Sequence, residues 1–349
     1  MVFVTGGTGL VGSHLLIDLV RMGKDVVALK RTDSNLEPVR FIFESGLPGG
    51  TELFSKIKWI DGDILDIAGL SGSMKNCDEV YHCAAIVSNN PHKKKMMIDA
   101  NVRGAANMVN AAMENSVRKF CFVSSIAVLG SEYEIGSGEM IDERNDQGTI
   151  YDYSTYAVTK LGGEREVWRG MAEGLNAVIV NPGVIIGPGN WGKSSTSFFT
   201  TLRKGLKFYS TGIIGFVDAR DVAKVMVELM GKNIFGERYI VIAENLSYRD
   251  VLFNIAGEIN ARKPSIHVGK RFLNIAWRFE HLRSFIFNLK PALPRDIAQP
   301  AYQKLYYSNK KISDTLNYRF IPIKKAITDT ARIFLEWEKK NAEKITAEY

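Results

Sequence analysis

A glycine-rich turn directly after the first apolar residues constrains the fold of this chain more than any other feature. Met1–Val4 runs into Thr5-Gly6-Gly7-Thr8-Gly9-Leu10-Val11-Gly12, where the apolar residues of a helix begin. A strand, a tight glycine turn and a helix in this order place backbone N–H groups of the helix N-terminus against phosphate. A simple tight turn is the alternative. We predict that the turn binds a dinucleotide cofactor through Thr5, Gly6, Gly7, Thr8, Gly9, Leu10, Val11 and Gly12.

The first half of the chain then alternates short, Val- and Ile-rich segments with helical ones. Strands of this kind are typical of a parallel sheet covered on both faces. We expect strands at Val2–Val4, Asp25–Leu29, Ile57–Ile60, Glu79–His82, Lys119–Val123, Ala177–Val180 and Tyr239–Ile242. We expect helices at Gly9–Met22, 93–115, around Tyr156 and Lys160, at Ser247–Asn260, and at Ile323–Lys340. The pattern predicts an α/β fold with a Rossmann doubly wound parallel sheet.

The pattern becomes irregular after Asn181-Pro182-Gly183. We predict a dinucleotide-binding Rossmann domain over 1–180, to which 215–245 return. Residues 181–214 and 246–349 are expected to form a smaller, mostly helical C-terminal substrate lobe. No flexible Gly/Ser linker separates the two.

Composition excludes several classes of protein. The 349 residues are 46% hydrophobic and 24% charged, with a net charge of +7. This charge is mild and no nucleic-acid-binding motif accompanies it, so we expect no nucleic-acid partner. No apolar run reaches the length of a membrane span, and the first strand leaves no room for a signal peptide. The cysteines follow no metal spacing, so we expect a cytoplasmic protein with buried thiols and no metal. They are Cys77, Cys83 and Cys121.

Tyr156 and Lys160 are the strongest candidates for catalysis. Their i, i+4 spacing places them on one face of a helix. An ammonium group beside a phenol lowers the pKa of the phenol, which suits it to proton transfer. Ser125 ends the fifth expected strand, where the active sites of parallel sheets open, and can hold a substrate oxygen. A surface Tyr–Lys pair is the alternative.

The end of the second expected strand indicates which dinucleotide binds. A carboxylate about 20 residues past the glycines would bind the ribose 2′-hydroxyl of NAD. The strand ends instead in Lys30-Arg31, whose cations attract a 2′-phosphate. We therefore predict NADP(H) over NAD(H). A solvated basic strand end is the alternative, and Asp33 complicates the prediction.

Together these motifs resemble the extended short-chain dehydrogenase/reductase family over roughly residues 1–250. Segments of this chain match the sequence motifs of the family in the same order. They are the glycine turn, Asp61-Gly62-Asp63-Ile64, His82-Cys83-Ala84-Ala85, Asn101-Val102-Arg103-Gly104, Ser124-Ser125, Asn181-Pro182-Gly183 and Phe216-Val217-Asp218. The resemblance implies that Asp63 meets the adenine and that Asn181-Pro182-Gly183 lies beside the nicotinamide. The cofactor contacts it implies are Asp63, Ile64, Cys83, Ala84, Ala85, Asn101, Val123, Lys160, Asn181, Pro182, Gly183 and Val184.

Some of these matched residues also have structural interpretations. Asp63 could cap a helix near Leu65, and Asn101 could bond within its own helix. We favour His82 as a buried histidine satisfied by backbone, and expect Asp221 to cap the helix that follows it.

Within the family, the segment Ser125 to Gly130 most resembles the dihydroflavonol-reductase and 3β-hydroxysteroid-dehydrogenase branch. This implies NADPH-dependent reduction of a ketone or aldehyde of a small, apolar molecule. A nucleotide-sugar epimerase or dehydratase with tightly bound NAD is the alternative, and a non-catalytic NADP-sensing regulator a remote one. The resemblance also implies a homodimer.

The substrate pocket is expected to draw on Ile86-Val87-Ser88, 126–153, 184–200 and the C-terminal lobe. The aromatic segment 272–287 could be core, a lid, or a peripheral membrane contact. Core is the interpretation we favour.

Overall fold

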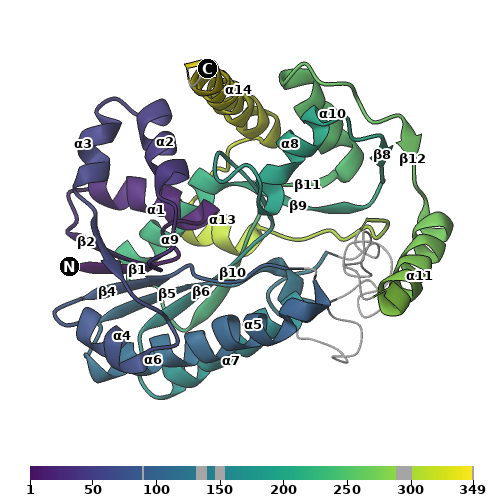
Figure 1. The fold of residues 1–349 in the computed structure, drawn as a ribbon. Coiled ribbons are helices and arrows are strands. Elements are labelled where there is room, and N and C mark those ends of the chain that lie inside the picture. The colour runs from purple at the N-terminus through teal and green to yellow at the C-terminus, as the bar shows by residue number, and fades with distance from the viewer. Residues whose placement is uncertain (89, 131–139, 146–153, 288–300, 348–349) are drawn as a thin grey trace.

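A parallel sheet forms the centre of the protein in a computed structural model, which describes residues 1–88, 90–130, 140–145, 154–287 and 301–347 (Figure 1). Over these residues the sheet has seven strands in the order β10-β6-β5-β4-β1-β2-β3. The strands are β1 Val2–Thr5, β2 Val26–Lys30, β3 Lys58–Asp61, β4 Glu79–His82, β5 Lys119–Val123, β6 Ala177–Pro182 and β10 Glu237–Val241. Every pairing in this sheet is parallel. The predicted Rossmann fold is confirmed, and the strand order reverses between β1 and β4, where dinucleotides bind in such sheets.

Helices cover both faces of the sheet. Figure 1 shows α1, α2, α3 and α9 on one face and α4, α6 and α7 on the other. The described helices are α1 Leu10–Arg21, α2 Glu37–Gly46, α3 Gly50–Ser55, α4 Ile67–Ser73, α5 Lys94–Ile98, α6 Gly104–Glu114, α7 Thr155–Ala172, α8 Ser197–Arg203, α9 Ala219–Gly231, α10 Tyr248–Glu258, α11 Lys270–Phe287, α13 Lys310–Leu316 and α14 Ile323–Ala347. Alternate residues of each strand enter the two apolar cores on either side, so both faces of the sheet are buried.

The helix expected over 93–115 is interrupted. A short 3₁₀ turn at Pro91–Lys93 leads into α5, and a π-helical turn over Asp99–Arg103 separates α5 from α6. Such turns are rare and are frequent at functional sites. The turn contains Asn101, one of the predicted site residues.

The rest of the chain adds strands as well as the expected helices. β7 Val184–Ile186, β9 Ile213–Asp218 and β11 Glu244–Ser247 form a three-stranded sheet, and β8 Phe208–Tyr209 pairs with β12 Ile266–His267. α8, α10 and α14 enclose a separate core that contains Trp191, Phe199 and Phe334. The sequence analysis did not predict these small sheets. The last helix extends to Ala347, beyond the expected end at Lys340.

The prediction that Asp221 caps a helix is wrong. Asp218 caps α9, since its carboxylate accepts the backbone N–H of Arg220 at 2.7 Å. Asp221 lies buried in the first turn and accepts bonds from the Tyr318 hydroxyl at 2.9 Å and the Ile321 N–H at 2.8 Å. Because these partners lie about a hundred residues away in the chain, local spacing could not reveal them.

Candidate active site

The glycine turn leaves no room for larger side chains. Gly6 has a φ of +71°, and a Cβ there would lie 2.5 Å from the Ala84 nitrogen. A Cβ on Gly12 would lie 2.2 Å from the Gly6 carbonyl oxygen. Gly6 therefore allows the turn, and Gly12 lets α1 start directly against it.

The N-terminus of α1 suits a pyrophosphate. Its N-cap is Gly9, which has no side chain to bond the first N–H groups, and the first turn contains no acidic residue. The orphan N–H groups and the positive end of the helix dipole therefore face outward without a competing carboxylate. These features fit the predicted dinucleotide. The residues that would surround its phosphates are Gly7, Thr8, Gly9, Leu10 and Val11.

Thr5 has a structural task within this turn. Its buried hydroxyl lies 2.6 Å from Nδ1 of His82 and 3.4 Å from the Ala84 N–H. Burial lowers the pKa of His82 to about 3, so the ring is neutral. His82 is thus buried as expected, but it is bonded by a side-chain hydroxyl and not by backbone.

The basic end of β2 is partly neutralised. Lys30 forms an ion pair with Asp61, its register partner on β3. Arg31 is more exposed, with 63% of its side chain accessible, and its nearest recorded carboxylate is Asp33 at 3.4 Å. The sequence analysis missed Asp61 because the pairing of β2 with β3 is not visible in local spacing. Arg31 is left as the main cation at this site.

Ser125, Tyr156 and Lys160 come together at the carboxyl end of the sheet. Ser125 follows β5 and hydrogen-bonds the Tyr156 side chain, while its own oxygen accepts the Ala127 N–H at 3.2 Å. Burial raises the pKa of Tyr156 to about 12, and the bond with Ser125 partly opposes this. Tyr156 is therefore protonated at neutral pH, which is the form that can donate a proton.

Lys160 lies under the active site with its side chain buried. Its ammonium donates to the Val123 carbonyl at 2.5 Å and lies 4.5 Å from the centre of the Phe122 ring. Burial lowers the pKa of Lys160 to about 8, whereas the nearby charge of Glu164 raises it. Val123, a predicted cofactor contact, thus orients the lysine through its backbone.

Asn101 connects the π-helical turn to α7, the helix that contains Tyr156 and Lys160. Its oxygen accepts the Ile86 N–H at 2.7 Å, and its amide donates to the Ile86 carbonyl and to the Thr159 hydroxyl, both at 3.0 Å. These bonds are long-range, so the interpretation that Asn101 bonds within its own helix is wrong. They hold the segment after β4 beside α7.

The remaining predicted cofactor residues lie around the same edge of the sheet. Asp63 is exposed and accepts the Leu65 N–H at 2.9 Å, but the helix that follows is capped by Asp66. Asn181 is buried and donates to the Ser125 carbonyl at 3.1 Å. A Cβ on Gly183 would lie 2.3 Å from the Gly215 carbonyl, so this glycine lets β7 approach β9. The others lie at the last residue of β3, β4 or β6 or within three residues after it: Ile64, Cys83, Ala84, Ala85, Pro182 and Val184.

Two charged side chains with little exposed surface, those of Glu164 and Arg238, were not predicted from the sequence. Glu164, one turn beyond Lys160 on α7, has no exposed side-chain surface and pairs with Arg238 of β10 at 3.3 Å. The i+4 spacing from Lys160 was the available signal, but nothing in the sequence indicated its partner.

Part of the expected substrate pocket, 131–139 and 146–153, lies outside the described residues. The aromatic segment belongs to α11, at the periphery of the molecule (Figure 1). Leu273 is buried, while Phe272 and Ile275 are 56% and 70% exposed. No helix among the described residues combines the length and the apolarity needed to cross a bilayer.

Comparisons with known proteins agree with this arrangement. A putative dihydroflavonol 4-reductase of Synechocystis sp. is 28% identical, covering 95% of this chain and 94% of that protein. Cinnamoyl-CoA reductase 1 of Petunia hybrida is 25% identical, over 96% and 92% of the two chains. The crystal structure of gox2253 superposes with a TM-score of 0.80 at 25% identity, covering 96% of this chain and 98% of that one.

The model of the NAD-dependent epimerase/dehydratase family matches residues 2–243. This range contains the glycine turn, Ser125, Tyr156 and Lys160. The chain therefore belongs to the NAD-dependent epimerase/dehydratase family, within its extended short-chain dehydrogenase/reductase branch, and is an NAD(P)-dependent oxidoreductase.

Proposed function

We propose that this protein is a reductase that uses NADPH to convert a ketone or aldehyde of a small, apolar molecule into an alcohol. The observation that carries the proposal is the hydrogen-bonded pair Ser125–Tyr156 beside the buried ammonium of Lys160. The similarity to reductases over more than nine-tenths of both chains supports it.

The three side chains have distinct tasks in the proposed reaction. A nicotinamide held at this edge of the sheet would supply a hydride to the carbonyl carbon. Ser125 donates a hydrogen bond to the carbonyl oxygen and fixes its position, and the Tyr156 hydroxyl gives that oxygen its proton. The positive charge of Lys160, one helical turn away on α7, would stabilise the tyrosinate that forms.

Arg31 supports the choice of NADPH. Its exposed guanidinium at the end of β2 can hold a 2′-phosphate through paired, charge-assisted hydrogen bonds. The ion pair between Lys30 and Asp61 removes a carboxylate that would otherwise repel that phosphate.

A nucleotide-sugar epimerase or dehydratase with retained NAD is the second candidate. It is favoured because the matching family model is that of NAD-dependent epimerases and dehydratases. The two candidates differ in what the purified protein contains. Denaturing the protein and identifying released nucleotide by mass spectrometry separates them. Stoichiometric NAD that survives dialysis supports the second candidate, and an empty protein that takes up NADPH supports the first.

The Tyr156→Phe variant tests the chemistry. NADPH oxidation with apolar carbonyl compounds is expected to fall by at least about a hundredfold, because the proton donor is removed while the ring remains. Tyr306→Phe is the matched control, since it removes a phenol whose side chain is 37% exposed. Full activity in Tyr156→Phe would remove Tyr156 from the mechanism.

Other predictions remain to be tested. They are the division into a Rossmann domain and a substrate lobe, the homodimer, the cytoplasmic location and the role of 272–287. Sedimentation of the purified protein measures the oligomeric state, and co-sedimentation with lipid vesicles tests membrane contact. Cell fractionation would locate the protein.

A further inference from the structure

Glu164 is a buried carboxylate on the same face of α7 as the two catalytic residues of that helix. Tyr156, Lys160 and Glu164 follow one another at intervals of four residues. The Glu164 side chain has no exposed surface. An ionised carboxylate is costly to bury unless its partners offset the lost hydration, so its surroundings indicate what it does.

Two partners of Glu164 connect it to Ser125: Ser124, its neighbour in the chain, and Asn181 of β6. The Ser124 hydroxyl donates to Oε2 of Glu164 at 2.8 Å. The Asn181 amide donates to the same oxygen at 3.2 Å and to the Ser125 carbonyl at 3.1 Å. One carboxylate oxygen therefore connects the catalytic helix to the residue before Ser125 and, through Asn181, to Ser125 itself.

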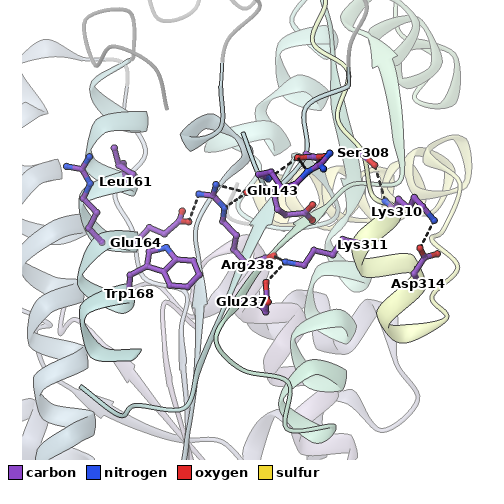
Figure 2. Close-up of a pocket in the computed structure, with 13 residues that line it drawn as sticks. Glu143, Leu161, Glu164, Trp168, Glu237, Arg238, Ser308, Lys310, Lys311 and Asp314 are labelled. Atoms are coloured by element: carbon purple, nitrogen blue, oxygen red, sulfur yellow. Dashed lines mark hydrogen bonds and ion pairs between the residues drawn. The ribbon is translucent and has the colours of Figure 1, made fainter. Parts of the chain in front are cut away.

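The other oxygen of Glu164 contacts Arg238. The guanidinium lies 3.3 Å from Oε1 and is held in place by the Glu143 carbonyl, to which it donates at 2.6 and 3.0 Å. Its side chain is 11% exposed. Both residues line a cleft of about 1040 Å³. Figure 2 shows their side chains pointing toward each other. Arg238 thus contacts the carboxylate oxygen of Glu164 that is not bonded by Ser124 and Asn181.

We propose that Glu164 is a positioning residue of the active site, which holds Ser125 in register with Tyr156 and places a negative charge one helical turn from Lys160. The expected effect of Glu164 on turnover rests on the proposed function. Its expected effect on the titration of Lys160 does not depend on any substrate.

Among the described charged and titratable groups around Lys160, Glu164 is the one that supplies negative charge. From β4 and the residue after it, His82 is neutral with a pKa near 3 and the Cys83 thiol is neutral with a pKa raised to about 12. On α7, Tyr156 is protonated at neutral pH. Beyond Glu164 lies the cation Arg238, followed by Glu143, whose pKa is raised by burial. Without the charge of Glu164, burial would lower the pKa of Lys160 further.

The Glu164→Gln variant separates charge from shape. The glutamine oxygen can still accept the bond from Ser124, but the negative charge near Lys160 is gone. We expect the Lys160 titration to move down by about one pH unit. We also expect kcat to fall by roughly tenfold or more while KM changes little, because the reacting groups lose their alignment. The alkaline limb of the kcat profile should move with the Lys160 titration.

The Lys160 titration can be measured directly. Protein labelled with ¹⁵N-lysine gives a side-chain nitrogen signal that Lys160→Met assigns, and its shift from pH 6 to pH 10 reports the midpoint. Glu166→Gln is the matched control, with the same chemical change two residues along α7 at a carboxylate paired with Arg169. That variant should leave both the midpoint and kcat unchanged.

The results have clear consequences. A folded Glu164→Gln protein with an unchanged Lys160 midpoint overturns the inference, even if its melting temperature is lower. If the single variant does not fold because Arg238 loses its ion pair with Glu164, Glu164→Gln/Arg238→Gln removes both charges and should still lower the midpoint. If the wild-type protein reduces no carbonyl compound, the proposed function fails, while the lysine titration still decides the role of Glu164.

Discussion

Replacing Arg31 with alanine tests which cofactor the end of β2 selects. A hydrogen bond between charged groups contributes about 1.5–3 kcal/mol. Arg31 is 63% exposed and lies 3.4 Å from Asp33, so solvent and a competing carboxylate reduce its effect. We therefore take the lower end, about 1.5 kcal/mol, and expect NADPH affinity to fall by about tenfold. NADH affinity should stay the same, since NADH has no 2′-phosphate.

Titration of the intrinsic protein fluorescence with each cofactor measures both affinities. Arg332→Ala on α14, where the side chain is 58% exposed, is the matched control and should affect neither. Lys30→Ala adds a second arm, because it leaves Asp61 without its ion-pair partner on β2. The bare carboxylate would repel a 2′-phosphate and accept the ribose hydroxyl, so NADPH should weaken while NADH strengthens.

Two outcomes would refute this reasoning. Equal losses of NADPH and NADH in Arg31→Ala would mean that the side chain supports the fold of the site and not the phosphate. Unchanged affinities for both cofactors would mean that Arg31 is a solvated surface charge. Either result would transfer the choice of cofactor to other residues around the adenosine.

Two further predictions concern packing and pH. Gly12→Ala places a Cβ 2.2 Å from the Gly6 carbonyl oxygen. It should weaken cofactor binding and lower the free energy of unfolding, measured with denaturant, by about 1–3 kcal/mol. Gly46→Ala is the control and should change neither, because its Cβ would have no atom within 4 Å. Burial raises the pKa of Asp18 from 3.8 to about 6 in the folded protein. As pH rises from about 4 to 6, Asp18 loses its proton in the unfolded chain before it does so in the folded one, so the free energy of unfolding falls. Asp18→Asn should therefore add on the order of 1–2 kcal/mol above pH 6 and nothing below pH 4, as measured by urea unfolding across pH. A gain that persists at pH 4 would contradict the assignment to ionisation, and the exposed Asp25→Asn is its control.

The parts of the protein that sequence predicted well depend on neighbours in the chain. Gly6 and Gly12 act on the turn that contains them, and Ser247 caps α10 by accepting the N–H of Asp250 three residues on. The spacing of Tyr156 and Lys160 is a property of one helix. Short apolar segments likewise predicted the strands of the large sheet, because the central strands are buried on both faces along their own length.

Other features required the tertiary structure because their partners are distant in the chain. The register of β2 and β3 brings Asp61 to Lys30, and this changes the charge at the predicted cofactor site. Arg238 reaches Glu164 only because β10 pairs with β6 beside α7.

The pKa values of the catalytic groups follow the same division. Sequence shows that Lys160 is near Tyr156, and from this we expected a phenol with a lowered pKa. In the fold, burial raises the pKa of Tyr156 to about 12 and lowers that of Lys160 to about 8. Spacing along a helix determines which groups are neighbours, whereas the depth of burial and the long-range partners determine their charge, and these exist only once the chain has folded.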